Sequence, residues 1–272
     1  MIRLSGLRFP RNVFGSSTRR YAHITSYRRL PTRNLIWGTV GATLAISVAL
    51  AFSDTVRLDS NITPQDDPET TTDPATGIRF PKTVKVASKV PLPILSLVGV
   101  GVRTVSFLRV QVYSVAFYAD LDNPNLKLDP SMTPDEKIQE IVKTCACEIR
   151  IVPTRSTSYS HLRDAFIRAI TTRLSVSRKN GTLTDEQAFE AASPIRKLKT
   201  LFPNTALSKH SPLDIFLYPP IPGKPRVLIF RDLGSIESDW VATEFVLHYF
   251  EGEGPSPPLK KMVVETVQSL QK

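Results

Sequence analysis

The chain has 272 residues, of which 22% are charged, and a formal net charge of +10 at pH 7. Eight arginines and no lysine or acidic residue lie in residues 1–33, so this segment supplies most of the net charge. A basic chain ordinarily suggests nucleic-acid binding, but here the charge belongs to one terminal segment. Composition therefore predicts no nucleic-acid partner.

The first 76 residues divide into three segments of different composition. Residues 1–33 are rich in arginine, serine and threonine and free of acids, which is typical of a mitochondrial transit peptide. Residues 34–53 are uncharged and long enough to cross a ~30 Å hydrocarbon core. Arginines before this segment and acids after it favour a transmembrane segment in the inner membrane, with the following domain in the intermembrane space. The alternatives are a buried helix and a sorting signal that is removed after import. Residues 54–76 carry six acids without apolar periodicity, which predicts a disordered linker.

Residues 77–272 form one predicted domain in which strands come first and helices follow. Two helix starts are marked by capping boxes, Thr133 with Glu136 and Thr184 with Gln187. We expect strands near residues 78–80, 84–86, 95–103, 107–119, 146–152, 213–218 and 226–231, and helices over 134–144, from a cap at 156 or 157 to 178, over 185–201 with an interruption near Pro194, over 239–250 and over 259–270. This order predicts an α+β fold with helices layered on a largely antiparallel sheet.

Arg103 stands at the end of an apolar strand-like run. Side chains alternate along a strand, so Leu97, Gly99, Gly101 and Arg103 share one face, and the valines between them share the other. Glycines in a strand often mark a place where another backbone or a ligand comes close. One hypothesis is a hollow floored by the two glycines and ended by a fixed positive charge. The alternative is an arginine that reaches water at a hairpin.

Cys145 and Cys147 are separated by one residue on a predicted strand. Their side chains would point the same way and could not easily form a disulfide with each other. We interpret them as small buried thiols, because a metal site would need further ligands nearby.

Three segments together resemble the chalcone isomerase superfamily: residues 99–120, the Tyr159–Ser160 pair that opens a helix, and residues 238–261. Within it, the sequence is most similar to the fungal mitochondrial branch, the altered-inheritance-of-mitochondria proteins. The resemblance covers nearly all of residues 77–272. It implies an open-faced β-sandwich of chalcone isomerase type, with helices layered on a large antiparallel sheet and a ligand cleft between them.

The resemblance also implies roles for individual residues. Arg103 matches the arginine that stabilises the phenolate and the developing enolate in the plant enzymes, and Tyr159 matches their polarising tyrosine. Three other site positions differ from the enzymes. Tyr113 stands where they carry a threonine, Phe166 where they carry an asparagine, and Tyr249 where they carry a threonine or serine. Ring closure of a chalcone depends on such donors, so their loss argues against that reaction.

The retained pair, Arg103 and Tyr159, matches the carboxylate-binding pair of fatty-acid-binding proteins with this fold. The sequence therefore predicts a non-catalytic binder of a small, hydrophobic, amphipathic carboxylate, with fatty acid and haem as the leading candidates. For haem, the axial ligand would be His161 or His248. His161 and Tyr159 diverge by about 200° on a helix, so they are not expected to face a ligand identically. The alternatives are an intramolecular lyase acting on an unknown enone-like substrate and a structural inner-membrane protein.

Overall fold

The computed structural model describes residues 69–86, 91–105 and 108–270. The predicted transit peptide (1–33), the predicted transmembrane segment (34–53) and most of the predicted linker lie outside these residues. Within the described part of the chain, no helix has the length and apolar character needed to span a bilayer.

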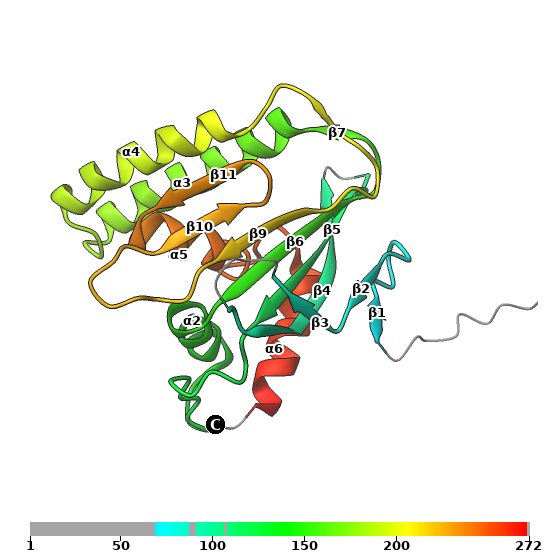
Figure 1. Cartoon of the computed structure of the whole chain (residues 1–272), viewed down its shortest axis with the longest axis horizontal. Coiled ribbons are helices and arrows are strands. Elements are labelled where there is room, and N and C mark those ends of the chain that lie inside the picture. The colour runs from blue at the N-terminus through cyan, green and yellow to red at the C-terminus, as the bar shows by residue number, and fades with distance from the viewer. Residues whose placement is uncertain (1–68, 87–90, 106–107, 271–272) are drawn as a thin grey trace, which may run out of the picture. The chain divides into compact units, whose positions relative to one another are not determined.

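A seven-stranded sheet, antiparallel throughout, forms the centre of the domain (Figure 1). Its spatial order is β11 (Gly234–Glu237), β10 (Val227–Phe230), β9 (Leu213–Leu217), β6 (Cys147–Pro153), β5 (Val110–Ala119), β4 (Ile94–Val105) and β3 (Thr83–Lys85). Two short pairs stand apart from it: β1 (Thr70–Thr72) with β2 (Arg79–Pro81), and β7 (Thr157–Ser158) with β8 (Ala206–Leu207). The predicted α+β class with an antiparallel sheet is confirmed.

The helices gather on one side of the curled sheet (Figure 1). They are α2 (Pro134–Thr144), α3 (Tyr159–Lys179), α4 (Asp185–Leu201), α5 (Asp239–Leu247) and α6 (Pro257–Ser269). Successive side chains of β5 point to opposite faces of the sheet. Val115 and Phe117 enter the large core beneath the helices, and Ala116 and Tyr118 enter a smaller core on the opposite face. The main core therefore lies between the sheet and the helices.

Local signals placed the helix starts well, and tertiary contacts changed two details. Both predicted capping boxes are present, at Thr133 and at Thr184. Helix α3 begins one or two residues later than predicted, with Ser158 as its cap, because Thr157 and Ser158 pair with β8. Helix α4 reaches Leu201 as predicted but continues through Pro194 without the predicted interruption, because buried residues on both sides of the proline keep its two halves on the core. Strands β1, β7, β8 and β11 were not predicted.

The two strand glycines are covered by a helix and do not floor a hollow. A Cβ at Gly101 would lie 2.2 Å from the backbone nitrogen of Leu259, and one at Gly99 would lie 2.7 Å from a side-chain carbon of Val263. Both contacts come from α6, which therefore packs its backbone directly against β4. The hollow predicted at Gly99 and Gly101 is wrong, and a neighbouring backbone is what comes close.

A register shift between Leu97 and Gly99 breaks the simple alternation expected for β4. As a result, Leu97 packs with Val100 on the smaller core, while Val98 joins the large core on the helix side. The predicted faces of Leu97 and Val98 are therefore wrong, because an irregularity in the pairing reverses the faces on its two sides. Beyond it the predicted alternation is confirmed, since Gly99 and Gly101 both face α6 and Val100 faces the smaller core.

The folded domain begins earlier than residue 77. Strand β1 pairs with β2, and Asp73, only 1% exposed, accepts hydrogen bonds from the hydroxyls of Ser114 (2.6 Å) and Thr76 (2.9 Å). These contacts join the segment to β5. Residues 69–76 are therefore part of the fold, and the predicted linker is shorter than residues 54–76.

The two cysteines are buried thiols and are not joined in a disulfide, as predicted. Cys145 and Cys147 are both fully shielded from solvent, and burial raises the pKa of Cys147. Their Sγ atoms are thus part of the core, as expected for small apolar side chains.

The smaller core contains a buried acid, Glu148, that lacks hydrogen-bond donors. Its side chain is fully buried, and neither carboxylate oxygen has a hydrogen-bond partner among the described residues. Arg150 approaches it at 3.2 Å but donates its hydrogen bonds to Asp214 at 2.6 and 3.1 Å. Burial, together with the charge of Asp214, raises the pKa of Glu148 to about 7, against the opposing effect of Arg150.

Glu148→Gln is expected to stabilise the protein at high pH. The folded state holds the Glu148 proton more tightly than the unfolded chain does. The contribution of this group to the free energy of unfolding is therefore fully present below pH 4.5 and is lost as the pH rises through 7. The predicted loss between about pH 5 and about pH 8 is on the order of 2 kcal/mol, and the glutamine variant should not show it. Urea unfolding at both pH values measures this. The exposed control Glu253→Gln should retain the loss, and an unchanged pH dependence in Glu148→Gln would contradict the prediction.

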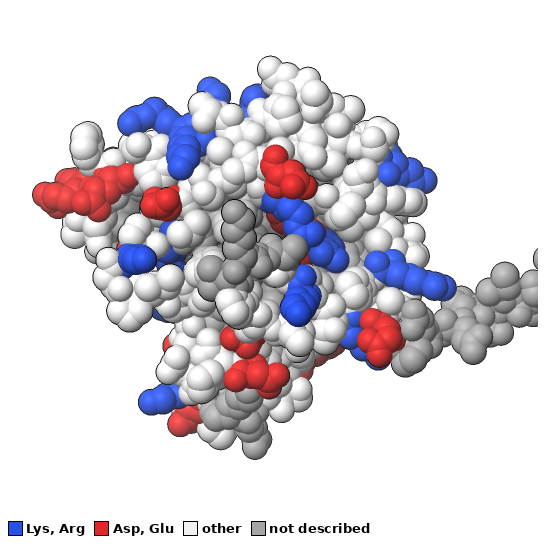
Figure 2. Space-filling view, viewed as in Figure 1, with Lys and Arg blue, Asp and Glu red and all other residues white. Residues whose placement is uncertain are grey.

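Acidic and basic side chains are interspersed over the face of the molecule shown in Figure 2. No large field of one sign covers this face. This distribution agrees with the inference that the net charge is concentrated in residues 1–33.

Candidate functional site

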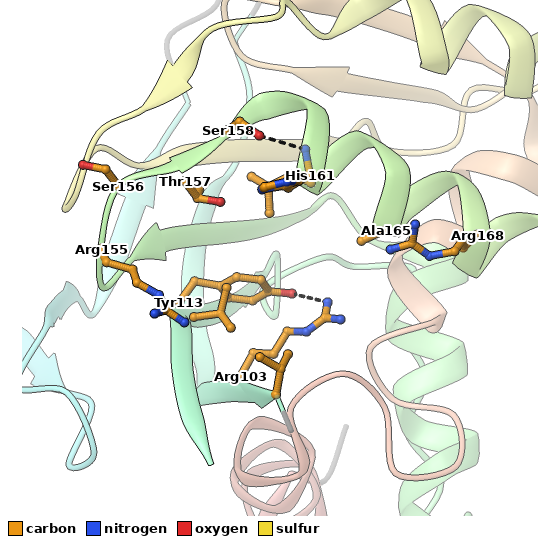
Figure 3. Close-up of a pocket in the computed structure, with 12 residues that line it drawn as sticks. Arg103, Tyr113, Arg155, Ser156, Thr157, Ser158, His161, Ala165 and Arg168 are labelled. Atoms are coloured by element: carbon orange, nitrogen blue, oxygen red, sulfur yellow. Dashed lines mark hydrogen bonds between the residues drawn. The ribbon is translucent and has the colours of Figure 1, made fainter. Parts of the chain in front are cut away.

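A cavity of about 640 Å³ opens between the end of the β4–β5 hairpin and the first half of α3 (Figure 3). The sheet contributes Arg103, Val105, Val112 and Tyr113, the segment before the helix contributes residues 155–158, and the helix contributes His161, Leu162, Ala165 and Arg168. In Figure 3, Arg103 and Tyr113 lie on the sheet side and the helix residues lie opposite them. The pocket therefore combines apolar walls with several cationic or polar groups.

One face of α3 lines this pocket and a neighbouring face enters the core. His161, Ala165 and Arg168 recur at the three- and four-residue spacing that brings helical side chains to one side. Phe166 and Ile170 lie on the adjacent stripe and are buried in the large core. The same helix therefore anchors itself to the sheet and presents polar groups to the cavity.

Arg103 and Tyr113 face each other across the β4–β5 ladder. The Nη1 atom of Arg103 donates a hydrogen bond of 3.0 Å to the Tyr113 hydroxyl, and its guanidinium carbon lies 5.5 Å from the centre of the tyrosine ring. Burial disfavours the charged form, but the Tyr113 and Tyr249 phenols raise the pKa of Arg103 above its ordinary value. The pocket therefore holds a permanent positive charge that is partly removed from water.

The other charged groups of this pocket are also cationic. Arg155 and Arg168 lie at opposite ends of it in Figure 3. No aspartate or glutamate lines the cavity, and within the described part of the chain none of the three arginines forms an ion pair with an acid. A pocket with this balance is suited to an anionic group.

Two of the predicted aromatic site residues are turned away from the cavity. Tyr159 does not line it, and its ring packs against Phe202 at 6.5 Å between centroids. Phe166 contacts Phe245 at 5.0 Å and Phe202 at 5.9 Å inside the large core. The predicted pairing of Arg103 with Tyr159 is therefore wrong in this structure, and Tyr113 is the phenol that meets Arg103.

Tyr249 and His248 lie behind the pocket rather than in its wall. Tyr249 is 1% exposed, and burial followed by the neighbouring Tyr113 raises its pKa well above the usual range. The rings of His248 and Tyr249 are in contact, with centroids 5.7 Å apart. Burial, with the charges of Arg173 and Arg103, lowers the pKa of His248 to about 4, so this histidine is neutral. Of the two predicted histidines, only His161 lines the cavity.

Sequence reasoning missed Arg155 and Arg168. Arg168 follows His161 by seven residues, which places both on one helical stripe, so the spacing was a usable signal for it. Arg155 lies in a connecting segment, where no periodicity indicates the direction of a side chain.

Comparison with known proteins agrees with this architecture. The family model described as "Chalcone isomerase like" matches residues 94–131 and 125–264. An uncharacterized protein of Schizosaccharomyces pombe is 32% identical over 181 residues, which cover 58% of this chain and 64% of that protein. The Saccharomyces cerevisiae protein "Altered inheritance of mitochondria protein 18, mitochondrial" is 23% identical over 232 residues, covering 70% of this chain and 69% of that protein.

A solved structure supports the same fold. The crystal structure of a fatty-acid binding protein of Arabidopsis thaliana superposes with a TM-score of 0.53 at 19% identity, covering 74% of this chain and 98% of that one. The matched family segments run from the start of β4 into α6, and so include the sheet and helices that build the pocket. The chain belongs to the chalcone isomerase-like family.

Proposed function

We propose that this protein is a non-catalytic binder of an amphipathic carboxylate, with a fatty acid as the leading ligand. The observation that carries the proposal is the Arg103 guanidinium, which faces an apolar-walled cavity and has a phenol, not an acid, as its hydrogen-bond partner. The Arabidopsis thaliana protein of similar fold is a fatty-acid binding protein, which supports this choice of ligand.

The chemistry of the pocket suits such a ligand. A guanidinium can hold both carboxylate oxygens with two parallel hydrogen bonds, and the Tyr113 hydroxyl beside it can add another. Val105, Val112 and Leu162 supply apolar wall for the first part of the tail. A cavity of about 640 Å³ falls within the range of small-molecule sites in proteins.

The location proposed for this activity is the mitochondrion. The composition of residues 1–33 and the mitochondrial relative of Saccharomyces cerevisiae both support it. The uncharged segment 34–53 supports attachment to the inner membrane with the domain in the intermembrane space.

Calorimetric titration of the full chain with dodecanoate, dodecanol and dodecylamine tests the ligand class. We expect one dodecanoate to bind per chain, with at least roughly tenfold weaker binding of the uncharged alcohol and no binding of the cationic amine. Equal affinity for dodecanoate and dodecanol would show that the carboxylate is not recognised. Turnover of a chalcone or another enone would instead support the alternative, an intramolecular lyase that uses Arg103.

Haem is a second candidate, because His161 lines the same cavity as Arg103. In that case Arg103 would hold a propionate, His161 would supply the axial nitrogen, and the bound group would supply redox or sensing chemistry. Haem titration followed by absorbance checks this assignment. His161→Ala should abolish the shifted Soret band, and His248→Ala should retain it. If the band persists in both variants, neither predicted histidine is the axial ligand.

A further inference from the structure

The end of the β4–β5 hairpin, next to the proposed carboxylate pocket, carries exposed apolar side chains. Leu108, in the turn between β4 and β5, is 69% exposed, and Val105, at the end of β4 and in the wall of the pocket, is 40% exposed. Single exposed apolar side chains are common, but apolar side chains that lie close together beside a pocket can mark an interaction surface.

Two arginines lie near this apolar end. Arg109 follows Leu108 directly and is exposed. Arg155 lies alongside the hairpin, because the adjacent Thr154 donates from its backbone nitrogen to the carbonyl of Val112 (3.1 Å) and from its hydroxyl to the carbonyl of Gln111 (2.9 Å). Neither arginine forms an ion pair with an acid of the described chain. Apolar and basic side chains therefore share one small surface beside the pocket.

We propose that this surface, formed by Val105, Leu108, Arg109 and Arg155, docks on a bilayer that contains anionic phospholipid. The apolar side chains would enter the interface between headgroups and acyl chains, and the guanidinium groups would pair with lipid phosphates. The positive charges of Arg109 and Arg155 complement anionic lipid headgroups, which favours a membrane over a purely apolar partner. The inference rests on the proposed function in one respect, because it names the membrane as the source of the fatty acid.

This placement has a physical consequence for ligand entry. The tail of a long fatty acid is strongly disfavoured in water, so a pocket that opens toward the bilayer avoids exposing it during transfer. Arg103 lies deeper on the same strand as Val105, so a carboxylate drawn in from the membrane surface would meet the outer arginines before it reached Arg103.

The test places a single environment-sensitive fluorophore on the full chain. Leu108→Cys is labelled with nitrobenzoxadiazole, and Phe189→Cys, at an apolar position on α4 that is 83% exposed, is the matched control. The native thiols Cys145 and Cys147 are fully buried and should not react in the folded protein. Each labelled variant is the full-length chain, so any attachment through residues 34–53 brings both variants to the vesicle equally.

We expect membrane contact only at position 108. With vesicles of phosphatidylcholine and phosphatidylglycerol, the emission at position 108 should shift to the blue and be quenched by brominated phosphatidylcholine, while the label at position 189 stays unchanged. Arg109→Glu in the Leu108→Cys background should raise the lipid concentration needed for half-maximal quenching about tenfold, and Lys179→Glu at the far end of α3 should not.

Two results would overturn the proposal. One is equal behaviour of the labels at positions 108 and 189 on anionic vesicles. The other is a blue shift at position 108 that grows with protein concentration without lipid, because it would assign the surface to contact between copies of the chain.

Arg103→Ala separates the two proposals, since it should abolish dodecanoate binding and leave the vesicle signal at position 108 intact. If the wild-type protein binds no dodecanoate but gives this signal, the ligand is wrong and the docking surface stands.

Discussion

Replacing Arg103 with alanine is expected to weaken dodecanoate binding about 100-fold or more. A bidentate pair between a guanidinium and a carboxylate contributes two charge-assisted hydrogen bonds, and losing both corresponds to at least ~3 kcal/mol in a partly buried site. The stability of the fold should not fall, because the Arg103 side chain is hydrogen-bonded only to Tyr113 among the described residues and its burial is unfavourable. Calorimetric titration gives the change in affinity, and urea unfolding verifies the fold.

Two further variants make this result specific. Arg103→Lys keeps the charge but loses the planar pair of donors, so its affinity should lie between those of wild type and Arg103→Ala. Arg79→Ala removes an exposed arginine from a different, smaller pocket beside the β1–β2 hairpin and should bind dodecanoate normally. An unchanged affinity in Arg103→Ala would refute the assignment of Arg103 as the carboxylate-binding residue.

The largest loss of stability is expected for Arg226→Met. The Arg226 side chain is 6% exposed and donates to four backbone carbonyls. Three of these carbonyls are at the end of α2 and belong to Val142, Lys143 and Cys145, at 3.0, 2.8 and 3.0 Å. The fourth belongs to Tyr218, directly after β9, at 2.9 Å. The guanidinium thus pairs helix-end carbonyls that no intrahelical donor can reach.

Methionine fills a similar volume but leaves these carbonyls without donors. Because each buried orphan group costs about 1–3 kcal/mol, we expect a loss of about 3 kcal/mol or more in the free energy of unfolding. Urea unfolding measures it, with Arg178→Met as control, because Arg178 is 55% exposed and pairs with an exposed aspartate. A midpoint for Arg226→Met equal to that of the control would show that water replaces the guanidinium at no cost.

Several features of the fold followed from residues that are close together in the sequence. The capping boxes at Thr133 and Thr184 depend on a contact between residues three apart, so the sequence alone located both helix starts. The antiparallel class followed from strands grouped before helices, and the fungal mitochondrial resemblance agrees with the family match. Arg103, Tyr113 and His161 were also assigned to a ligand cleft, and all three line the cavity.

The other assignments failed where they depended on contacts between distant segments. Gly99 and Gly101 signalled a close approach correctly, but nothing in the strand itself could show that α6, more than 150 residues later, makes that approach. Tyr159 and Phe166 lie on the core side of α3 because packing against Phe202 and Phe245 sets the rotation of that helix. Arg226 gave no local signal at all, since its four acceptors come from segments elsewhere in the chain.

The sequence by itself thus determined the order of the main strands and helices, the two helix starts with capping boxes and the arginine on which the candidate site depends. Only the tertiary structure decided which phenol contacts Arg103 and which arginines join it at the pocket. The physical reason is that caps and periodicity act between neighbouring residues. The partners of Arg103 depend on the cross-strand register of β4 and β5 and on the rotation of α3, both of which are fixed by packing across the whole domain.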